Sequence, residues 1–208
     1  MYAPSPYRVD DVNRICALMD AFPFATLVRN DTSGPVAAYL PLARSEGASG
    51  GAVLFGHLAK ANPFWLGADG AEVVALFSGP DGYISPSNYP SKQTHGKVVP
   101  TWNYVRVEVR GRLSIETSPG RLRHYMDMPT TMMERHREAP WSADDAPPDF
   151  INNLATAIVG IRIDVTSLEG SWKLDQRKAP IDRQGAIAGM RSEGNQDLAN
   201  LMAEITLA

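Results

Sequence analysis

The stretch Val105–Ile115 reads VRVEVRGRLSI and carries the clearest periodic pattern of the chain. Apolar side chains alternate with charged or polar ones along its whole length. Alternation this strict places one face of a strand on a core and the other face in water. Gly111 replaces one inward side chain, which indicates a bend or a close backbone approach, as at the corner of a barrel. The stretch therefore predicts a long antiparallel strand.

Shorter apolar runs on both sides of this strand predict a larger sheet. They lie at Phe24–Asn30, Pro35–Ala43, Ala52–Gly56, Ala71–Ser78 and Val159–Thr166. The turn residues Asp31–Gly34 (DTSG) predict a hairpin between the first two runs. The segment Arg44–Gly51 is rich in glycine and serine, and we expect a loop there.

Segments with a helical pattern occur before, after and among these strands, but they do not alternate regularly with them. Apolar residues at three- and four-residue spacing predict a helix over residues 9–22, with Asp10 as its N-cap. One or two helical turns are expected in HLAKANPFW, which begins at His57, with a break at Pro63. Further helices are expected from Ser118 to a kink or end at Pro129, and over Thr130–Glu138, Asp149–Ile158 and Asn195–Leu207. We therefore predict an α+β fold, predominantly antiparallel β, that forms a barrel or sandwich with peripheral helices.

Composition and charge argue against a membrane-spanning protein, a disulfide-linked fold and direct binding to DNA. The 208 residues suit one large domain, or one domain with a helical appendage, and no apolar run approaches a membrane span. The single cysteine allows no internal disulfide, and together with an N-terminus that lacks a secretory pattern it predicts a cytoplasmic protein. The net charge of −3 gives no basic excess, which disfavours direct DNA binding.

The stretch Gly79–Tyr104 is rich in proline and aromatic residues and is locally basic. Its prolines argue against a continuous helix or a central strand. Aromatic faces offer stacking surfaces, and lysines offer charge for an anion, so we interpret the stretch as a long binding loop. The alternative is a surface loop whose aromatic residues cover a core.

Metal and nucleotide motifs are absent from the sequence. No histidine is spaced from another histidine or a cysteine as metal ligands are, and no glycine-rich phosphate loop follows a strand. His57 and Lys60 stand at the end of a predicted strand, where free N–H groups and a lysine would favour an anion. Taken alone, this pattern favours the alternative that Lys60 is an ordinary surface lysine. The arginines at 121, 123, 135 and 137 favour a solvated helix face over a DNA-recognition helix.

Several stretches together resemble one family. They are FPFATLV (22–28), GHLAKANPFW (56–65), residues 79–107, PWSADDAPPDFI (140–151), AIVGIRI (157–163) and EGSWKLDQ (169–176). These stretches resemble the PaiB family of FMN-binding negative transcriptional regulators, which have a split β-barrel like that of pyridoxamine-phosphate oxidase. The resemblance implies a homodimer that binds FMN between its subunits and regulates transcription through flavin binding or redox sensing. A flavin-dependent oxidoreductase of an unknown small molecule, with a small-molecule redox partner, remains the alternative.

The resemblance also implies domain limits and a cofactor site. Residues 1–170 would form the FMN-binding split barrel with inserted helices, and residues 171–208 a tail and helix that pack on the same domain or on the partner subunit. The cofactor-binding residues would be His57, Lys60 and Asn62 at the phosphate, Lys92, Thr101, Trp102 and Asn103 near the ring, and Trp172, Lys173 and Gln176 closing the site. No residue is assigned a catalytic proton transfer.

The sequence departs from the family pattern at four positions. Asn88 stands where tryptophan is expected, and Ser171, Asp175 and Arg177 are substituted in the tail motif. Asp175 places a carboxylate near the expected phosphate site, where it would weaken or reshape flavin binding.

Overall fold

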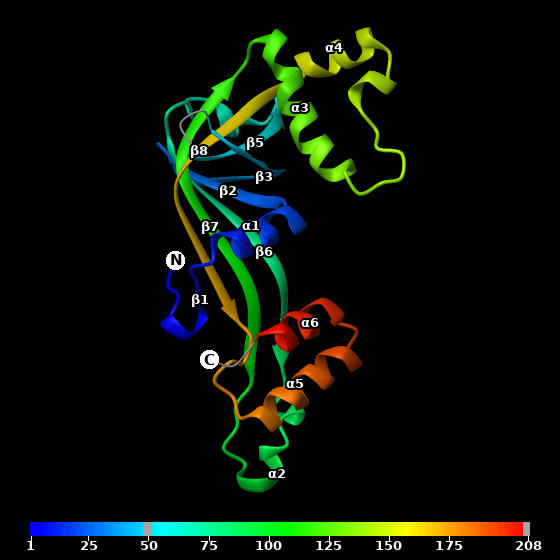
Figure 1. Ribbon diagram of the computed structural model, residues 1–208. Coiled ribbons are helices and arrows are strands. Elements are labelled where there is room, and N and C mark those ends of the chain that lie inside the picture. The colour runs from blue at the N-terminus through cyan, green and yellow to red at the C-terminus, as the bar shows by residue number, and fades with distance from the viewer. Residues whose placement is uncertain (48–50, 206–208) are drawn as a thin grey trace. The chain divides into compact units, whose positions relative to one another are not determined.

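The computed structural model describes residues 1–47 and 51–205 of the chain (Figure 1). Within them, the strands form one sheet in the order β3-β2-β6-β7-β8-β5-β4, and β1 pairs with β8. The strands are β1 (Arg8–Val9), β2 (Phe24–Asp31), β3 (Gly34–Pro41), β4 (Ala43–Glu46), β5 (Ala52–Ala59), β6 (Glu72–Ile84), β7 (Thr101–Glu116) and β8 (Ile158–Lys173).

Six α-helices and several 3-10 turns accompany the strands in the described residues. The helices are α1 (Val12–Ala21), α2 (Ser91–His95), α3 (Pro119–Glu134), α4 (Pro148–Thr156), α5 (Pro180–Ser192) and α6 (Gln196–Glu204). The 3-10 turns used below are η2 (Pro63–Trp65) and η3 (Pro86–Asn88). The predicted combination of an antiparallel sheet with helices is confirmed.

The chain divides into two compact units. Unit 1 contains Met1–Ile15, Ser78–Val107 and Glu169–Ala208, and unit 2 contains Cys16–Phe77 and Glu108–Leu168. The three long strands β6, β7 and β8 each contribute residues to both units. In unit 2, α3 packs against β4, β5 and α4, and in unit 1, α5 packs against α6 and η3. The last three residues of the predicted tail, 206–208, lie outside the described residues.

Strand β7 follows the alternation that its sequence predicts. Val105, Val107, Val109, Gly111 and Leu113 are buried, while the residues that alternate with them are exposed or half-buried. A Cβ added at Gly111 would lie 2.5 Å from the backbone oxygen of Asp164. The predicted close backbone approach is therefore confirmed, and it occurs against β8.

Two pairings fix the register of the strands in unit 2. The β2–β3 hairpin closes at Asp31 opposite Gly34, as the DTSG turn predicts. Strand β5 pairs antiparallel with β8 from Val53 opposite Asp164 to Ala59 opposite Ile158. The second pairing carries β5 three residues beyond its predicted end and determines where the following turn begins.

Two loop predictions are wrong where strands replace them. Strand β6 continues through Pro80 to Ile84. Strand β2 pairs with β6 only at Val74–Leu76, so the residues of β6 after Leu76 donate no hydrogen bond to β2. A proline, which has no N–H, is therefore tolerated at position 80. Strand β4 occupies Ala43–Glu46 because these residues pair with β5. Residues 48–50 of that predicted loop lie outside the described residues.

The helix boundaries differ from the predictions at three places. Helix α1 begins at Val12, and Asp11 rather than Asp10 accepts the backbone hydrogen bonds at its start. Helix α3 runs through Pro129 to Glu134 instead of breaking there, so no separate helix begins at Thr130. After β5 the chain makes a turn and then η2, rather than helical turns that begin at His57.

We predict that Gly111→Ala lowers the free energy of unfolding by about 1–3 kcal/mol, because the new methyl group overlaps the Asp164 carbonyl and the backbone must shift. Gly120→Ala is the matched control, since nothing lies within 4 Å of a Cβ at that helical position. Denaturant unfolding measures both variants. Equal stability of Gly111→Ala and the parent would contradict the close approach.

Candidate functional site

The turn after β5 in unit 2 carries the three residues that the sequence assigns to a phosphate. His57 lies within β5, opposite Gly160 of β8, and is half-buried. Lys60 is exposed at the start of the turn, and Asn62 is half-buried just before η2. All three therefore come from one short segment of β5 and its turn.

A hydrogen bond to helix α3 fixes the orientation of His57. Its Nδ1 lies 3.1 Å from the backbone oxygen of Tyr125, and since a carbonyl can only accept, Nδ1 carries the proton and donates. That carbonyl is available because Pro129, four residues later in α3, has no N–H to donate to it. The proline inside α3 thus frees the acceptor that holds His57, and Nε2 is the nitrogen left for a ligand.

Tyr125 can take this position because of a glycine in β8. A Cβ at Gly160 would lie 2.6 Å from the Tyr125 ring, so the ring packs directly on the strand backbone. Tyr125 is itself buried and meets Phe55 edge to face at 5.6 Å. The β5–β8 pairing and the α3 packing therefore set the position of His57 together.

The backbone of the turn does not supply the anion cradle expected from the sequence. The N–H of Lys60 donates to Ala157 at 2.8 Å, and the N–H of Asn62 donates to Ala59 at 2.9 Å. The Asn62 side chain accepts from the N–H of Phe64 and caps η2. The ammonium group of Lys60 has no hydrogen-bond or ion-pair partner in residues 1–47 and 51–205. The available positive charge of the turn is therefore the Lys60 side chain.

Arg29 holds the segment that follows this turn. Its guanidinium is buried and donates to the backbone oxygens of Phe64 at 2.8 Å and Leu66 at 3.1 Å. It also lies 5.1 Å from the centre of the Phe64 ring. The role of Arg29 is not visible in the sequence pattern, because its acceptors at Phe64 and Leu66 are backbone groups more than thirty positions away.

In unit 1, the start of β7 and the end of β8 are joined through Lys173. Its ammonium donates to the hydroxyl of Thr101 and, at 2.8 Å, to the backbone oxygen of Trp102. The structure thus brings together three of the predicted cofactor residues. Trp102 is half exposed, donates to Asp81 at 3.1 Å, and has its ring 6.3 Å from that of Tyr83.

The remaining predicted residues of unit 1 differ in exposure. Asn103 is fully buried and donates to the sulfur of Met202, and Trp172 is 2% exposed and has its ring directly beside Gly170. Gln176 is half-buried and bonds within its own turn, while Lys92 is exposed and donates to Ser87 at 3.3 Å. Asn103 and Trp172 therefore support the surrounding structure from the core.

A buried polar pair lies beside Lys173. The hydroxyl of Tyr89 donates to Asp175 at 2.9 Å, and both side chains are buried. Burial raises the pKa of the Asp175 carboxyl, and the hydrogen bond from Tyr89 acts in the opposite direction. Burial and the Asp175 carboxylate raise the pKa of the Tyr89 hydroxyl, which stays protonated and donates.

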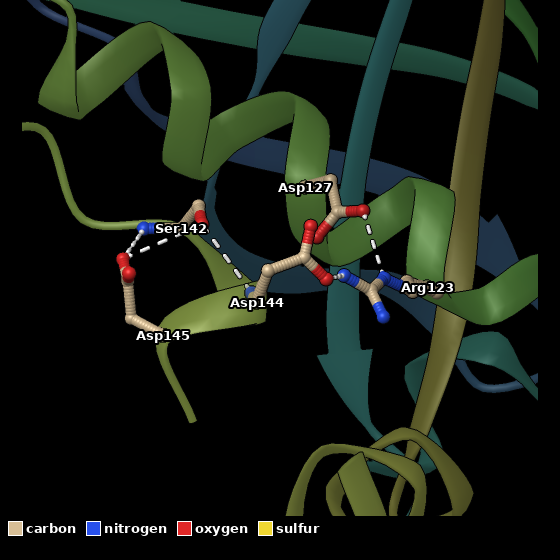
Figure 2. A network of polar contacts seen from close by, with 5 residues as sticks. All are labelled: Arg123, Asp127, Ser142, Asp144 and Asp145. Atoms are coloured by element: carbon tan, nitrogen blue, oxygen red, sulfur yellow. Dashed lines mark hydrogen bonds and ion pairs between the residues drawn. The ribbon is translucent and has the colours of Figure 1, made fainter. Parts of the chain in front are cut away.

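The arginines of α3 are neutralised by carboxylates. Figure 2 shows Arg123 between Asp127, at 3.3 Å, and Asp144, while Ser142 and Asp145 cap the neighbouring 3-10 turn. Arg121 pairs with Glu116. Beyond the end of α3, Arg137 pairs with Glu134, whereas Arg135 donates to the ring of His136 and not to a carboxylate. Because three of these four arginines are paired with carboxylates, little charge is left for the phosphates of DNA, which supports the interpretation of a solvated helix face.

The described residues contain neither a cluster of metal ligands nor a membrane-spanning helix. No group of three or more histidine, cysteine, aspartate or glutamate side chains is arranged there to hold a metal ion. None of the helices described combines the length and the apolar character needed to cross a membrane.

Solved structures share this fold. The FAD and heme binding protein from Mycobacterium smegmatis is similar with a TM-score of 0.57 and 17% identity, over 80% of this chain and 73% of that one. The flavocytochrome Anf3 from Azotobacter vinelandii is similar with a TM-score of 0.51 and 16% identity, over 80% of this chain and 69% of that one. The open antiparallel sheet with its helices is the split-barrel fold of flavin-binding proteins, as the family resemblance implies.

The family follows from the sequence match. The family model described as "Putative FMN-binding domain" matches residues 1–167. The protein named "Protease synthase and sporulation protein PAI 2" from Bacillus subtilis (strain 168) is 30% identical over 206 residues, which cover 99% of this chain and 96% of that protein. The chain belongs to this family of FMN-binding domains, its cofactor is FMN, and the resemblance to the PaiB family is confirmed.

The side chains present suit this cofactor. In unit 2, Lys60 offers an ammonium group of the kind that binds a phosphate, without an ion-pair partner among the described residues. In unit 1, taken by itself, Trp102 offers a half-exposed indole of the kind that stacks on an aromatic ring. Thr101 and Lys173 add a hydroxyl and a second cation. When bound, FMN supplies the redox chemistry, and the protein supplies binding, orientation and electrostatics.

We predict that the stability difference between Asp175→Asn and the parent depends on pH. The folded-state pKa of Asp175 is raised by burial, so the parent loses stability as pH rises above the ordinary value of 3.8 and through the folded-state pKa. The variant has no carboxyl to ionise. The thermal midpoint of Asp175→Asn, relative to that of the parent, should therefore rise between acidic and neutral pH. A difference in midpoint that stays constant with pH would show that burial does not disfavour the ionised carboxyl.

Proposed function

We propose that the chain is an FMN-binding regulator of the PaiB type, in which flavin binding or the redox state of the flavin sets its activity as a negative transcriptional regulator. The observation that carries this proposal is the match to the Bacillus subtilis sporulation protein over nearly the whole of both chains. A cytoplasmic homodimer is part of the proposal, as the family resemblance implies.

The paired arginines of α3 and the net charge of −3 support regulation that is indirect or passes through a partner. DNA affinity depends chiefly on cations that can neutralise phosphates, and both arginines of α3, together with Arg137 beyond its end, already face carboxylates. The sensing step would therefore lie in the flavin site rather than in a DNA-recognition helix.

In this proposal the FMN phosphate binds at the turn after β5. Lys60 supplies the charge, the Nε2 of His57 faces the phosphate, and Asn62 shapes the turn as the cap of η2. Thr101, Trp102, Lys173, Gln176 and Lys92 remain candidates for the ring and its surroundings, and Asn103 and Trp172 support them from the core.

Lys60→Ala should weaken FMN binding by about one to two orders of magnitude, because a charge-assisted phosphate contact contributes roughly 1.5–3 kcal/mol. Lys97→Ala, which removes another exposed lysine, is the matched control and should bind FMN like the parent. Flavin fluorescence titration measures the affinity, and size-exclusion chromatography should show a dimer for all three proteins. Unchanged FMN affinity in Lys60→Ala would remove Lys60 from the site, and rapid oxidation of NAD(P)H by the flavin-loaded protein would favour an oxidoreductase.

A further inference from the structure

A hollow of about 350 Å³ lies in unit 2, against helix α3. It is lined by Asp20 near the end of α1, by Ala43 and Arg44 of β4, and by residues between His124 of α3 and Arg135 just beyond that helix. None of the residues assigned above to FMN is among the described residues that line it. Its volume is at the lower end of the range for small-molecule sites, which suits a compact ligand.

Two methionines give the hollow an apolar surface. Met128 and Met132 lie four residues apart on the same side of α3, and both are half-buried. Ala43 of β4 adds a small, fully buried side chain. Because methionine is unbranched and flexible, its side chain adapts to apolar ligands of different shapes. The hollow therefore offers contacts to a short hydrocarbon chain.

Arg135 brings a positive charge that no carboxylate of the described residues neutralises. Its Nε donates to Nε2 of the His136 ring at 2.9 Å. The guanidinium forms no ion pair within residues 1–47 and 51–205. A hydrogen bond to a ring nitrogen leaves the charge of the guanidinium in place, so Arg135 remains available to an anion.

Arg44 has hydrogen-bonding capacity left over. Its Nη2 pairs with Asp20 at 3.1 Å, its Nε is buried without a partner, and its Nη1 forms no hydrogen bond in the part of the chain that the structure describes. A guanidinium carries five N–H donors. An acceptor oxygen beside Nη1 would therefore satisfy a donor that the protein leaves open.

The two carboxylates among the described lining residues already hold arginines. Asp20 accepts from Arg44, and Asp127 accepts from Arg123 at 3.3 Å (Figure 2). A cationic ligand would have to displace these arginines and would be repelled by Arg135. An anion instead meets one positive charge that lacks a partner. The arrangement of charges therefore favours a ligand with a single negative charge.

We propose that this hollow binds a small monocarboxylate with a short apolar tail, independently of the flavin. The planar guanidinium of Arg135 matches a carboxylate in shape and charge, and Nη1 of Arg44 supplies a further donor. Met128, Met132 and Ala43 take the tail. Because a hydrocarbon gains by leaving water, the apolar surface distinguishes this ligand from a small inorganic anion.

The same helix carries the group that orients His57. His124 lines the hollow, and its ring meets those of Phe55 and Tyr125 edge to face at 5.2 and 5.7 Å. The backbone oxygen of Tyr125, the next residue, accepts the hydrogen bond from His57. A ligand in the hollow therefore contacts α3 without occupying any residue assigned to FMN, and both ligands should bind at the same time.

Hexanoate is the probe, titrated calorimetrically into the full-length protein with and without saturating FMN while flavin absorbance is followed. One hexanoate per chain should bind in both cases, and the flavin should be retained. Acetate, which has the carboxylate but only a methyl group, should bind at least about tenfold more weakly. Hexylamine, which carries an ammonium group on a six-carbon chain, should show no measurable binding.

Arg135→Gln should weaken hexanoate binding at least about tenfold, because it removes the charge-assisted contact. Arg137→Gln is the matched control, since it removes the same charge two residues further on, outside the hollow, and it should bind hexanoate like the parent. Met132→Glu should abolish binding, because the new carboxylate would pair with Arg135 and repel the ligand. Met132 is only half-buried, and circular dichroism should show that this variant folds.

The outcomes separate this site from the flavin site. Lys60→Ala should lose affinity for FMN while keeping that for hexanoate, so failure of the proposed flavin placement would leave the present proposal intact. Release of FMN by hexanoate would show that the hollow belongs to the flavin site and would overturn it. Absence of hexanoate binding at millimolar concentration, equal losses in Arg135→Gln and Arg137→Gln, or equal affinities for hexanoate and hexylamine would overturn it as well.

Discussion

The hydrogen bond from His57 to the carbonyl of Tyr125 is the interaction on which the candidate phosphate turn depends. It exists because Pro129 leaves that carbonyl without its usual helical donor. Gly160 lets the Tyr125 ring lie on β8, and β8 in turn fixes β5 through backbone pairing. Pro129 in α3, Gly160 in β8 and His57 in β5 therefore act together. The register of β5 on β8 then determines where Lys60 lies.

In unit 1, polar side chains are held by contacts of a different kind from those that hold His57. Its polar residues are fixed by the Tyr89–Asp175 pair and by the side chain of Gln176, while the neighbouring cations remain unpaired. On α3 the arginines meet carboxylates instead. Ion pairing therefore differs between α3, where Arg121 and Arg123 meet carboxylates, and the ends of β5 and β8, where Lys60 and Arg177 have no ion-pair partner among the described residues.

The structural features that the sequence predicts correctly are those that depend on residues close together in the chain. The alternation of β7, the close approach at Gly111 and the hairpin at Asp31–Gly34 follow from local pattern, and the structure confirms all three. The extension of β6 past Pro80 could not be predicted, because it depends on how far β2 pairs alongside it. For the same reason, the end of β5 was placed too early.

The site was predictable in its residue types but not in its contacts. Lys60 and Trp102 could be selected from motif and chemistry, whereas the roles of Tyr125, Arg29 and Tyr89 come from partners tens of residues distant. One signal was present, since a proline inside a helical segment frees the carbonyl four residues earlier. The burial of Asn103 and Trp172 follows from tertiary packing, which motif matching does not reveal.

The central claim is that this chain binds FMN and uses a protein cation to hold the phosphate. The most direct measurement compares FMN with riboflavin, which lacks that phosphate, for retention by the purified protein after gel filtration, with absorbance giving the stoichiometry. The account predicts one FMN retained per chain and riboflavin bound at least about tenfold more weakly. Equal retention of both flavins, or retention of neither, would contradict it.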